Sequence, residues 1–337
     1  MNNKLPKIYF GPMTKNIVDV LLKYSIDQNA AIGFIPSRRQ VEHDGGYVNS
    51  WKTKDFYEYV KKINSNALVC RDHGGRSQGK TLDDGKVSFQ EDAKTGFDII
   101  HIDPWKNFTS LDEVAETTCD NIERCLSINP NLRFEIGTEE AIHPYTPEEL
   151  DYFLYKTQNQ LGDKFEKVLY AVVQFGTAIV GTKNVGVFNR HRSKQMIDVC
   201  KKYKVLSKEH NGDYLTKAEI EDRFNIGLDA INIAPEFGVL ETSTVIEHML
   251  DNMDFENLDK FFEVCYESKK WVKWIPPEVA SLETSLVSLF IARVCGHYVM
   301  NSPFVLDYKA KNPKLDTLIQ ESLRVKISDT MSLCKNQ

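Results

Sequence analysis

Residues 97–136, FDIIHIDPWKNFTSLDEVAETTCDNIERCLSINPNLRFEI, carry the pattern that decides the fold of this chain. Two short apolar runs, 97–102 and 132–136, have the length and the isoleucine and phenylalanine content of buried β-strands. Between them, apolar side chains recur at helical spacing from Leu111 to Leu126, so one face of this segment is suited to packing against a sheet. Ser110 and Glu113 predict a capping box at the start of that helix. The order strand, helix, strand predicts a parallel βαβ unit.

The same alternation extends over about the first 240 residues, and its strand ends recur about every 25 to 38 residues, as in repeated βα units. Helix starts are marked by Thr146 with Pro147 and Glu149, and by Thr216 with Glu219. Eight strands alternating with helices predict an α/β fold, a closed (β/α)8 TIM barrel. The six further strand-length runs are 7–10, 31–35, 67–70, 168–173, 205–207 and 230–233.

The character of the chain changes after residue 233, where the pattern becomes mostly helical. We expect residues 1–250 to form the barrel and residues 251–337 to form a C-terminal helical extension packed on it. Pro276-Pro277 and Asn312-Pro313 are expected to interrupt the helices of this extension. Trp271 and Trp274 either pack the extension against the barrel or mark an interface with a partner.

The composition excludes several classes of protein. The chain has 337 residues, of which 42 are Lys or Arg and 48 are Asp or Glu, so its net charge of -6 argues against a general binder of nucleic acid or acidic membranes. No apolar run reaches the length of about 18 residues that a membrane span requires. The seven cysteines are scattered and form no CxxC pair, which fits reduced thiols and a cytoplasmic location.

In a (β/α)8 barrel, active groups lie just past the C-terminal ends of the strands, and the unusual polar residues of this chain fall there. A convergence of imidazoles and carboxylates is what a divalent-metal site needs, and a spare carboxylate can act as an acid or a base. Any one of these side chains alone can equally be a helix cap or a salt-bridge partner; their presence on successive strands favours a site. They include Asp72, His73, His101, Asp103, Glu135, Glu139, Glu140, His210 and Asn232.

Glycines follow the sixth and seventh predicted strands, from which barrels commonly build a phosphate site. Gly176, Gly181, Gly186 and Gly212 would allow a phosphate to approach the backbone, although each can equally be a turn glycine. None belongs to a Walker or dinucleotide fingerprint, so no nucleotide cofactor is expected.

The ordered motifs resemble the class II ketose-bisphosphate aldolases, and most closely the branch called the non-catalytic subunit of tagatose-bisphosphate aldolase. The specificity lies in the series, which spans residues 8 to 250, because each motif is short. The matching segments are Gln40 with Gly45-Gly46-Tyr47, Arg71-Asp72-His73, Ile100-His101-Ile102-Asp103, Glu135 to Glu139, Val172 to Gly176, Glu209-His210 and Asn232 to Pro235.

The resemblance implies a divalent metal cofactor, for which zinc is the first expectation. His73 and His210 resemble two of the three histidines that hold the catalytic metal in that family. Asp103 and Glu135 resemble carboxylates that lie behind those ligands or bind the metal in an alternate position. We therefore expect His73, His210, Glu135 and Asp103 to form the metal site.

The resemblance also implies catalytic and substrate-binding residues. Asp72 resembles the acid that protonates the aldehyde oxygen, and Glu139, with Glu140 as the alternative, resembles the glutamate that moves a proton at the substrate carbon. Three residues resemble groups that hold the phosphate and hydroxyls of a ketose phosphate, namely Gly176, Gly212 and Asn232. Basic residues that can hold a second phosphate or a carboxylate, or that simply lie in solvated loops, are Arg38, Arg39, Arg71 and Lys183.

Two positions depart from the family pattern. Ile179 stands where catalytic members place a metal-binding histidine, and isoleucine cannot bind a metal. The glycine-rich loop after the seventh strand is replaced by Asn211-Gly212-Asp213-Tyr214. Either a rearranged set that includes Glu135, Gln174 or Glu209 holds the ion, or the original activity is lost.

These observations favour a metal-dependent aldolase-type lyase that cleaves or forms a C–C bond of a phosphorylated ketose through a metal-stabilised enediolate. An epimerase or isomerase on the same scaffold is a close alternative. A non-catalytic partner subunit that stabilises a catalytic aldolase is a second, and Ile179 favours it. Beyond the phosphorylated sugar, we expect a homo-oligomer, or an assembly with a catalytic aldolase subunit, and no nucleic-acid or membrane partner.

Overall fold

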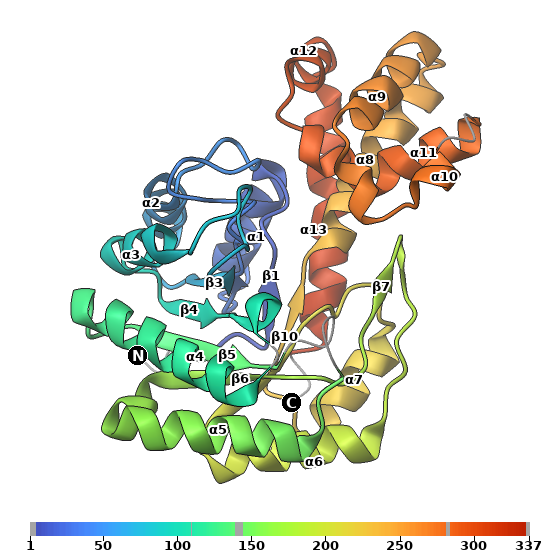
Figure 1. The fold of residues 1–337 in the computed structure, drawn as a ribbon. Helices are drawn as coiled ribbons and strands as arrows, with labels where there is room; N and C mark the ends of the chain where they lie inside the picture. The colour runs from blue at the N-terminus through green and yellow to red at the C-terminus, as the bar shows by residue number, and fades with distance from the viewer. Residues whose placement is uncertain (1–4, 109, 139–143, 281–283, 335–337) are drawn as a thin grey trace.

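Each of the eight predicted strand regions overlaps one strand of a closed parallel barrel (Figure 1). The computed structural model describes residues 5–108, 110–138, 144–280 and 284–334. The prediction of a (β/α)8 barrel is therefore confirmed. Around the barrel the strands follow one another in the order β1, β10, β9, β6, β5, β4, β3 and β2. Their bounds are β1 Ile8–Phe10, β2 Gly33–Phe34, β3 Leu68–Gly74, β4 Ile99–Ile102, β5 Arg133–Gly137, β6 Val168–Val173, β9 Leu206–Glu209 and β10 Ala230–Ile233.

Helices follow the barrel strands as the periodicity predicts. The capping boxes expected at Thr146 and Thr216 are both present. The one expected at Ser110 is not, because the Ser110 side chain makes no capping hydrogen bond; acidic residues in the first turn, Asp112 and Glu113, favour that helix end instead. The helices are α1 Lys15–Asp27, α2 Thr53–Ile63, α3 Lys86–Thr95, α4 Leu111–Ile128, α5 Pro147–Leu161, α6 Arg190–Lys202, α7 Lys217–Asn225 and α8 Pro235–Asp251.

Strand alternation decides which side chains line the barrel interior. On β3, Cys70 belongs to the small apolar cluster inside the barrel, whereas its neighbour Arg71 pairs with Asp92 of α3 outside it. On β9, Lys208 points inward and Glu209 pairs with Arg223 of α7. The interior therefore combines an apolar layer with charged groups from a few strands.

A short antiparallel hairpin, β7 Ile179–Val180 and β8 Lys183–Asn184, interrupts the regular alternation between β6 and α6. The sequence pattern did not predict it, since each strand has only two residues. Ile179 lies on this hairpin and not on a barrel strand. The turn of the hairpin contacts the C-terminal helices, because a Cβ built on Gly181 would lie 2.7 Å from the Phe290 ring.

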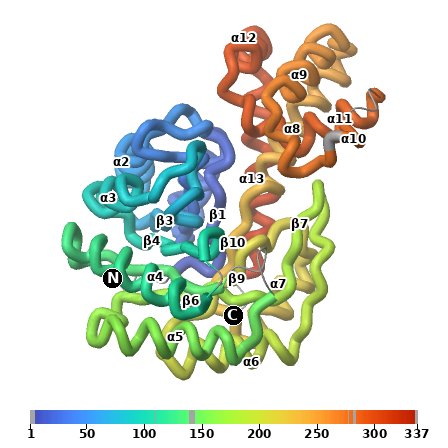
Figure 2. Tube along the Cα trace, viewed as in Figure 1, coloured from blue at the N-terminus to red at the C-terminus, as the bar shows by residue number. Residues whose placement is uncertain are grey.

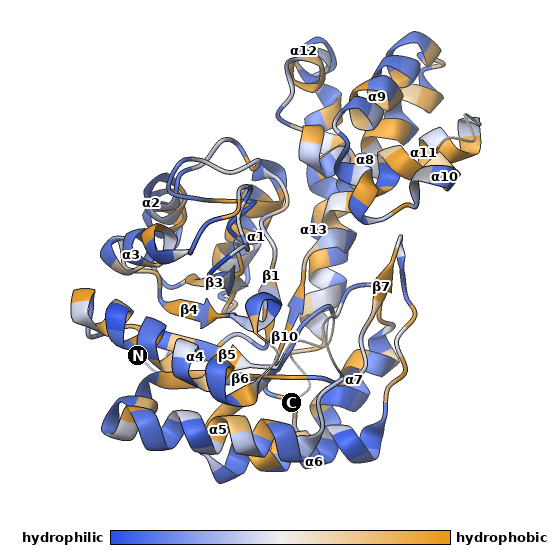
Figure 3. Ribbon diagram, viewed as in Figure 1, coloured by the Kyte–Doolittle hydropathy of each residue, from blue (hydrophilic) through white to orange (hydrophobic). Residues whose placement is uncertain are grey.

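The C-terminal segment is helical, as expected, and α9 to α12 form a lobe beside the barrel (Figure 1). Both α9 and α11 carry hydrophobic residues, and the two helices pack against each other (Figure 3). Figure 2 shows α13 returning from the lobe alongside α8, and it also packs against α1. The division of the chain at residue 250 stays a prediction. The helices are α9 Phe255–Glu267, α10 Pro277–Ala280, α11 Ser285–Cys295, α12 Pro303–Lys311 and α13 Lys314–Ser332.

Trp271 is buried in the chain's own lobe, where its indole N–H donates to the carbonyl of Tyr266. This favours the packing interpretation of that residue. In the described part of the chain, no helix combines the length and the apolar character needed to cross a bilayer.

Candidate metal centre

Three histidines meet at the C-terminal ends of the barrel strands. His73 lies near the end of β3, His101 lies within β4, and His210 directly follows β9. One ring nitrogen of each lies within 4.8 Å of the corresponding nitrogens of the other two, and the ring centroids are 5.1 to 5.4 Å apart. Three imidazoles around one point can hold a zinc-like ion and leave a coordination position open for a substrate or water.

A bulge in β3 brings two consecutive residues to the same site. The register with β4 shifts between Arg71 and Gly74, and His73 has a left-handed backbone with φ of 45°. Neighbouring residues on a regular strand point to opposite faces, but here the Asp72 carboxylate lies 3.9 Å from His73 Nε2. Strained backbone of this kind is concentrated at functional sites.

The third histidine is His101, which lies on a predicted strand but was not among the predicted ligands. The family pattern directed attention to Ile179, which lies on the hairpin. His101 pairs in register with Glu135 of β5, so both side chains face the barrel interior. Burial lowers the pKa of His101 to about 4, which keeps its ring neutral and able to bind a metal at neutral pH. Strand alternation through residues 97–102 is the signal that could have identified His101 as a side chain of the barrel interior.

Asp103 lies behind His73, in the supporting position that was one of its two expected roles; direct binding of the metal by Asp103 stays a prediction. Its Oδ2 accepts hydrogen bonds from His73 Nδ1 at 2.7 Å and from Gln78 Nε2 at 2.7 Å. Burial by itself raises the pKa of Asp103, but the hydrogen bond from His73 outweighs it and the pKa falls to about 2. An ionised carboxylate here fixes the proton on His73 Nδ1 and leaves Nε2 for an ion, as in carboxylate–histidine–metal sites.

Glu135 lies beside all of these groups and is fully buried. Its Oε1 is 2.6 Å from His210 Nε2 and 4.0 Å from His101 Nδ1, while Oε2 accepts a 2.7 Å hydrogen bond from Lys208. Burial raises the pKa of Glu135, but Lys208 and His210 outweigh it and hold the pKa well below its ordinary value. The carboxylate thus orients His210; its role as a ligand stays a prediction.

Lys208 is a buried cation below the histidines. Its role was not predicted from the sequence. It has no exposed surface, pairs with Glu135, and lies 3.9 Å from the centre of the Tyr9 ring. Burial lowers the pKa of Lys208, but Cys70 and Glu135 raise it by more, so it stays charged. An ammonium held in an ion pair is not available as a nucleophile, which argues against a Schiff-base role.

Lys208→Met is expected to lower the free energy of unfolding of the metal-free protein by about 3 to 5 kcal/mol, because it leaves a buried carboxylate without its cation. Urea unfolding in the presence of a chelator measures the change. Lys202→Met removes an exposed ion pair with Asp151 and is expected to leave stability nearly unchanged. Equal effects of the two substitutions would show that the buried pair does not stabilise the barrel.

Asp72 lies beside the histidine cluster and is partly exposed. Its side chain is 16% exposed, and its Oδ1 lies 3.5 Å from the amide nitrogen of Asn232 on β10. The Asn232 Oδ1 atom is buried and has no hydrogen-bond partner among the residues that the structure describes. The pair therefore offers a carboxyl group for proton transfer and an amide oxygen for a substrate hydroxyl.

Two of the arginines predicted to bind substrate are committed to the chain's own groups, so these predictions are corrected. Arg71 is fully buried and donates to Asp92 and to the carbonyls of Pro36 and Val41. Arg38 is 1% exposed and pairs with Glu42 and Asp83. Strand alternation explains Arg71, which follows the inward-facing Cys70 and so points outward.

The other predicted residues have different outcomes. Glu139 and Glu140 lie outside the described residues. Lys183 is exposed on β8, and its role stays a prediction. Glu209, weighed as a substitute ligand, points outward to Arg223, and Gln174 accepts a hydrogen bond from the N–H of Tyr145.

The glycines after β6 and β9 allow other parts of the same chain to pack closely against their Cα atoms. Gly176 has a φ of +89°, and a Cβ there would lie 2.1 Å from the Val187 carbonyl oxygen. A Cβ on Gly212 would lie 2.4 Å from the Ile231 side chain. These contacts support the turn and packing interpretation over exposure to a phosphate.

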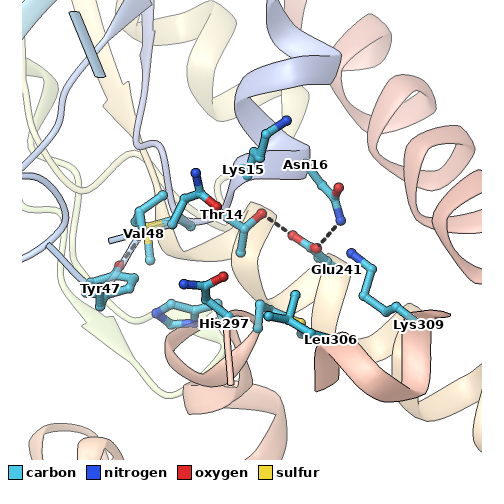
Figure 4. Close-up of a pocket in the computed structure, with 13 residues that line it drawn as sticks. Thr14, Lys15, Asn16, Tyr47, Val48, Glu241, His297, Leu306 and Lys309 are labelled. Atoms are coloured by element: carbon cyan, nitrogen blue, oxygen red, sulfur yellow. Dashed lines mark hydrogen bonds between the residues drawn. The ribbon is translucent and has the colours of Figure 1, made fainter. Parts of the chain in front are cut away.

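A separate cavity of about 100 Å³ lies where the β1–α1 loop meets the C-terminal helices (Figure 4). Glu241 of α8 accepts hydrogen bonds from Thr14 and Asn16 beside it. His297 is 2% exposed, and neither of its ring nitrogens has a hydrogen-bond partner within the described ranges. Burial lowers the pKa of His297 to about 3.

This burial predicts an acid-sensitive contribution to stability. The unfolded chain binds a proton at this histidine below pH 6.5, whereas the folded chain does so only near pH 3, so stability falls as the pH drops through that window. His297→Leu is expected to flatten the fall by up to about 1.4 kcal/mol per pH unit, as measured by urea unfolding between pH 7 and 4.5. The exposed His191→Leu serves as the control; equal slopes for wild type and His297→Leu would contradict the prediction.

Neither a family model nor a curated protein sequence matches this chain. Solved structures do. A probable tagatose 6-phosphate kinase from Sinorhizobium meliloti has a TM-score of 0.77 at 15% identity, with 97% of this chain and 99% of that chain covered. Fructose-bisphosphate aldolase from Campylobacter jejuni has a TM-score of 0.62 at 13% identity, covering 98% and 90%. The fructuronate-tagaturonate epimerase of Cohnella laeviribosi has a TM-score of 0.65 at 9% identity, covering 98% and 83%. At such identities the likeness establishes the barrel fold.

Proposed function

We propose that this chain is a metal-dependent enzyme that acts on a ketose or related sugar, most simply as an aldolase-type lyase. The observation that carries the proposal is the cluster of His73, His101 and His210 beside Asp72. A divalent ion held by these histidines, zinc in the first instance, would supply Lewis acidity toward a substrate carbonyl and would thereby favour cleavage of a C–C or C–H bond at the adjacent carbon.

The residues around the cluster have complementary tasks in this proposal. Asp103 and Glu135 orient His73 and His210. Asp72 transfers a proton to or from the substrate oxygen, and Asn232 accepts a hydrogen bond from a substrate hydroxyl. Each task uses a group whose position the barrel strands determine, so little rearrangement is needed on binding.

Epimerisation on the same site is the second candidate. Both an aldolase and a sugar epimerase share the fold of this chain with similar TM-scores, 0.62 and 0.65. Both reactions require stabilised negative charge next to a carbonyl, so the histidine cluster suits either. The third alternative, a non-catalytic partner subunit, has no physical need for three converging histidines with oriented rings.

Metal analysis and proton exchange test the proposal. The purified chain is expected to hold about one divalent ion and, with that ion, to exchange the proton next to the carbonyl of a ketose in D2O, as followed by NMR. Release of an aldehyde fragment identifies a lyase, and inversion without cleavage identifies an epimerase. A chain that binds no divalent ion and exchanges no proton would favour the partner-subunit alternative.

A further inference from the structure

The N-terminus of α8 is occupied by a carboxylate of the chain itself. Asp213, from the loop after β9, is 1% exposed, and its Oδ1 accepts hydrogen bonds from the N–H groups of Ala234 and Glu236, both at 2.9 Å. Glu236 lies in the first turn of the same helix, where its Oε2 accepts a hydrogen bond from the Tyr214 N–H at 2.9 Å. Two acidic side chains therefore crowd one helix start.

This is the place where a (β/α)8 barrel commonly binds phosphate. Phosphate groups lie between the loops after the seventh and eighth strands and accept hydrogen bonds from a helix N-terminus. In this chain those strands are β9 and β10, and the helix is α8. Asp213 takes the position of such an anion.

The neighbouring backbone N–H groups also donate hydrogen bonds within the chain. The N–H of Gly212 donates to the Asn232 carbonyl at 2.9 Å. Asn184 Oδ1 accepts from the N–H groups of Ala178 and Gly186, at 3.1 and 3.2 Å. The loops after β6 and β9 thus direct these N–H groups to acceptors of their own chain.

Charge opposes a phosphate at this position as well. Burial, followed by the charge of Glu236, raises the pKa of Asp213 to about 8, which reflects the cost of holding negative charge there. Lys326 pairs with Glu236 at 3.3 Å, yet the surroundings still disfavour a single negative charge on Asp213. A phosphate dianion would bring two negative charges to this position, next to Glu236, and is disfavoured more strongly.

We infer that the sugar bound at the histidine cluster carries a free hydroxyl, and no phosphate, at the end that faces β9 and β10. This inference rests on the proposed function and replaces the phosphorylated ketose expected from the sequence. The buried Oδ1 of Asn232, which has no partner in the described residues, is the acceptor for that hydroxyl. Asp213 is the residue that excludes phosphate.

Paired substrates test the inference on the zinc-containing full chain. Proton exchange in D2O is compared for fructose with fructose 1-phosphate and fructose 6-phosphate, and for tagatose with tagatose 6-phosphate. The unphosphorylated member of each active pair is expected to have the higher kcat/KM, by about tenfold or more. Faster exchange of the phosphorylated member would overturn the inference while leaving the proposed function intact. Exchange of neither would count against the proposed function, and the next experiment then decides the inference separately.

Substitution of Asp213 tests the phosphate position without a substrate. Asp213→Ser opens the N–H groups of α8, so inorganic phosphate is expected to raise the melting temperature of this variant but not that of the wild-type chain. Asp213→Asn keeps a hydrogen-bond acceptor but cannot ionise, and it is the second variant in case Asp213→Ser does not fold. It is expected to reduce discrimination against the phosphorylated sugar. Asp254→Ser, at the N-cap of α9, is the matched control and is expected to show no phosphate effect. Equal stabilisation of wild type and Asp213→Ser by phosphate would overturn the inference.

Discussion

His101→Ala is expected to reduce the divalent metal bound by the purified chain from about one ion to less than about a tenth of an ion. Removing one of three imidazoles leaves His73 and His210, and two nitrogen ligands do not hold a catalytic ion against a chelator. Activity that depends on the ion is expected to fall in parallel. Metal content after dialysis against a weak chelator, measured by elemental analysis, checks the result.

The control for this experiment is His191→Ala, because His191 is exposed on α6 and outside the cluster. Its metal content is expected to equal that of the wild-type chain. Circular dichroism of both variants establishes that the barrel is intact. Full retention of the ion by a folded His101→Ala chain would show that another residue supplies the third ligand.

Asp72→Asn is expected to lower the rate of proton exchange by about 10² to 10⁴ while leaving the metal in place. Asparagine has the size of aspartate and can keep the contact with Asn232, but it cannot donate or accept the proton that the reaction moves. The rate is measured by NMR in D2O with a ketose on which the wild-type chain is active, and metal content is measured on the same sample.

Asp44→Asn provides the matched control, since Asp44 is an exposed acid of the loop after β2. It is expected to have the wild-type rate. Loss of both the metal and the rate in Asp72→Asn would assign Asp72 to the support of the metal site. An unchanged rate would exclude it as the proton-transferring group.

Much of the architecture follows from local pattern. The apolar runs, their spacing and the helix-start signals at Thr146 and Thr216 depend on neighbours within a few residues, so they could be predicted directly. The capping box predicted at Ser110 is absent even though it too depends only on nearby residues. A cap requires one particular side-chain rotamer, which the residue types do not determine. The β7–β8 hairpin was missed because two-residue strands carry no periodicity.

The candidate site was predicted only in part. Asp72, His73 and His210 were predicted as site residues because they follow the ends of predicted strands. The structure brings them together with His101. Arg38 and Arg71 were misjudged because residue type alone does not say whether a cation meets solvent or a buried carboxylate.

The sequence by itself determined the barrel and the rim at which polar groups collect, because strand and helix periods and strand-end positions are local properties of the chain. Only the tertiary structure decided that His101 completes the cluster, that Lys208 neutralises Glu135, and that Asp213 fills the start of α8. Each of these contacts joins residues on different strands or loops. Their pairing depends on strand register and on the bulge in β3, and neither can be derived from the order of residues in one segment.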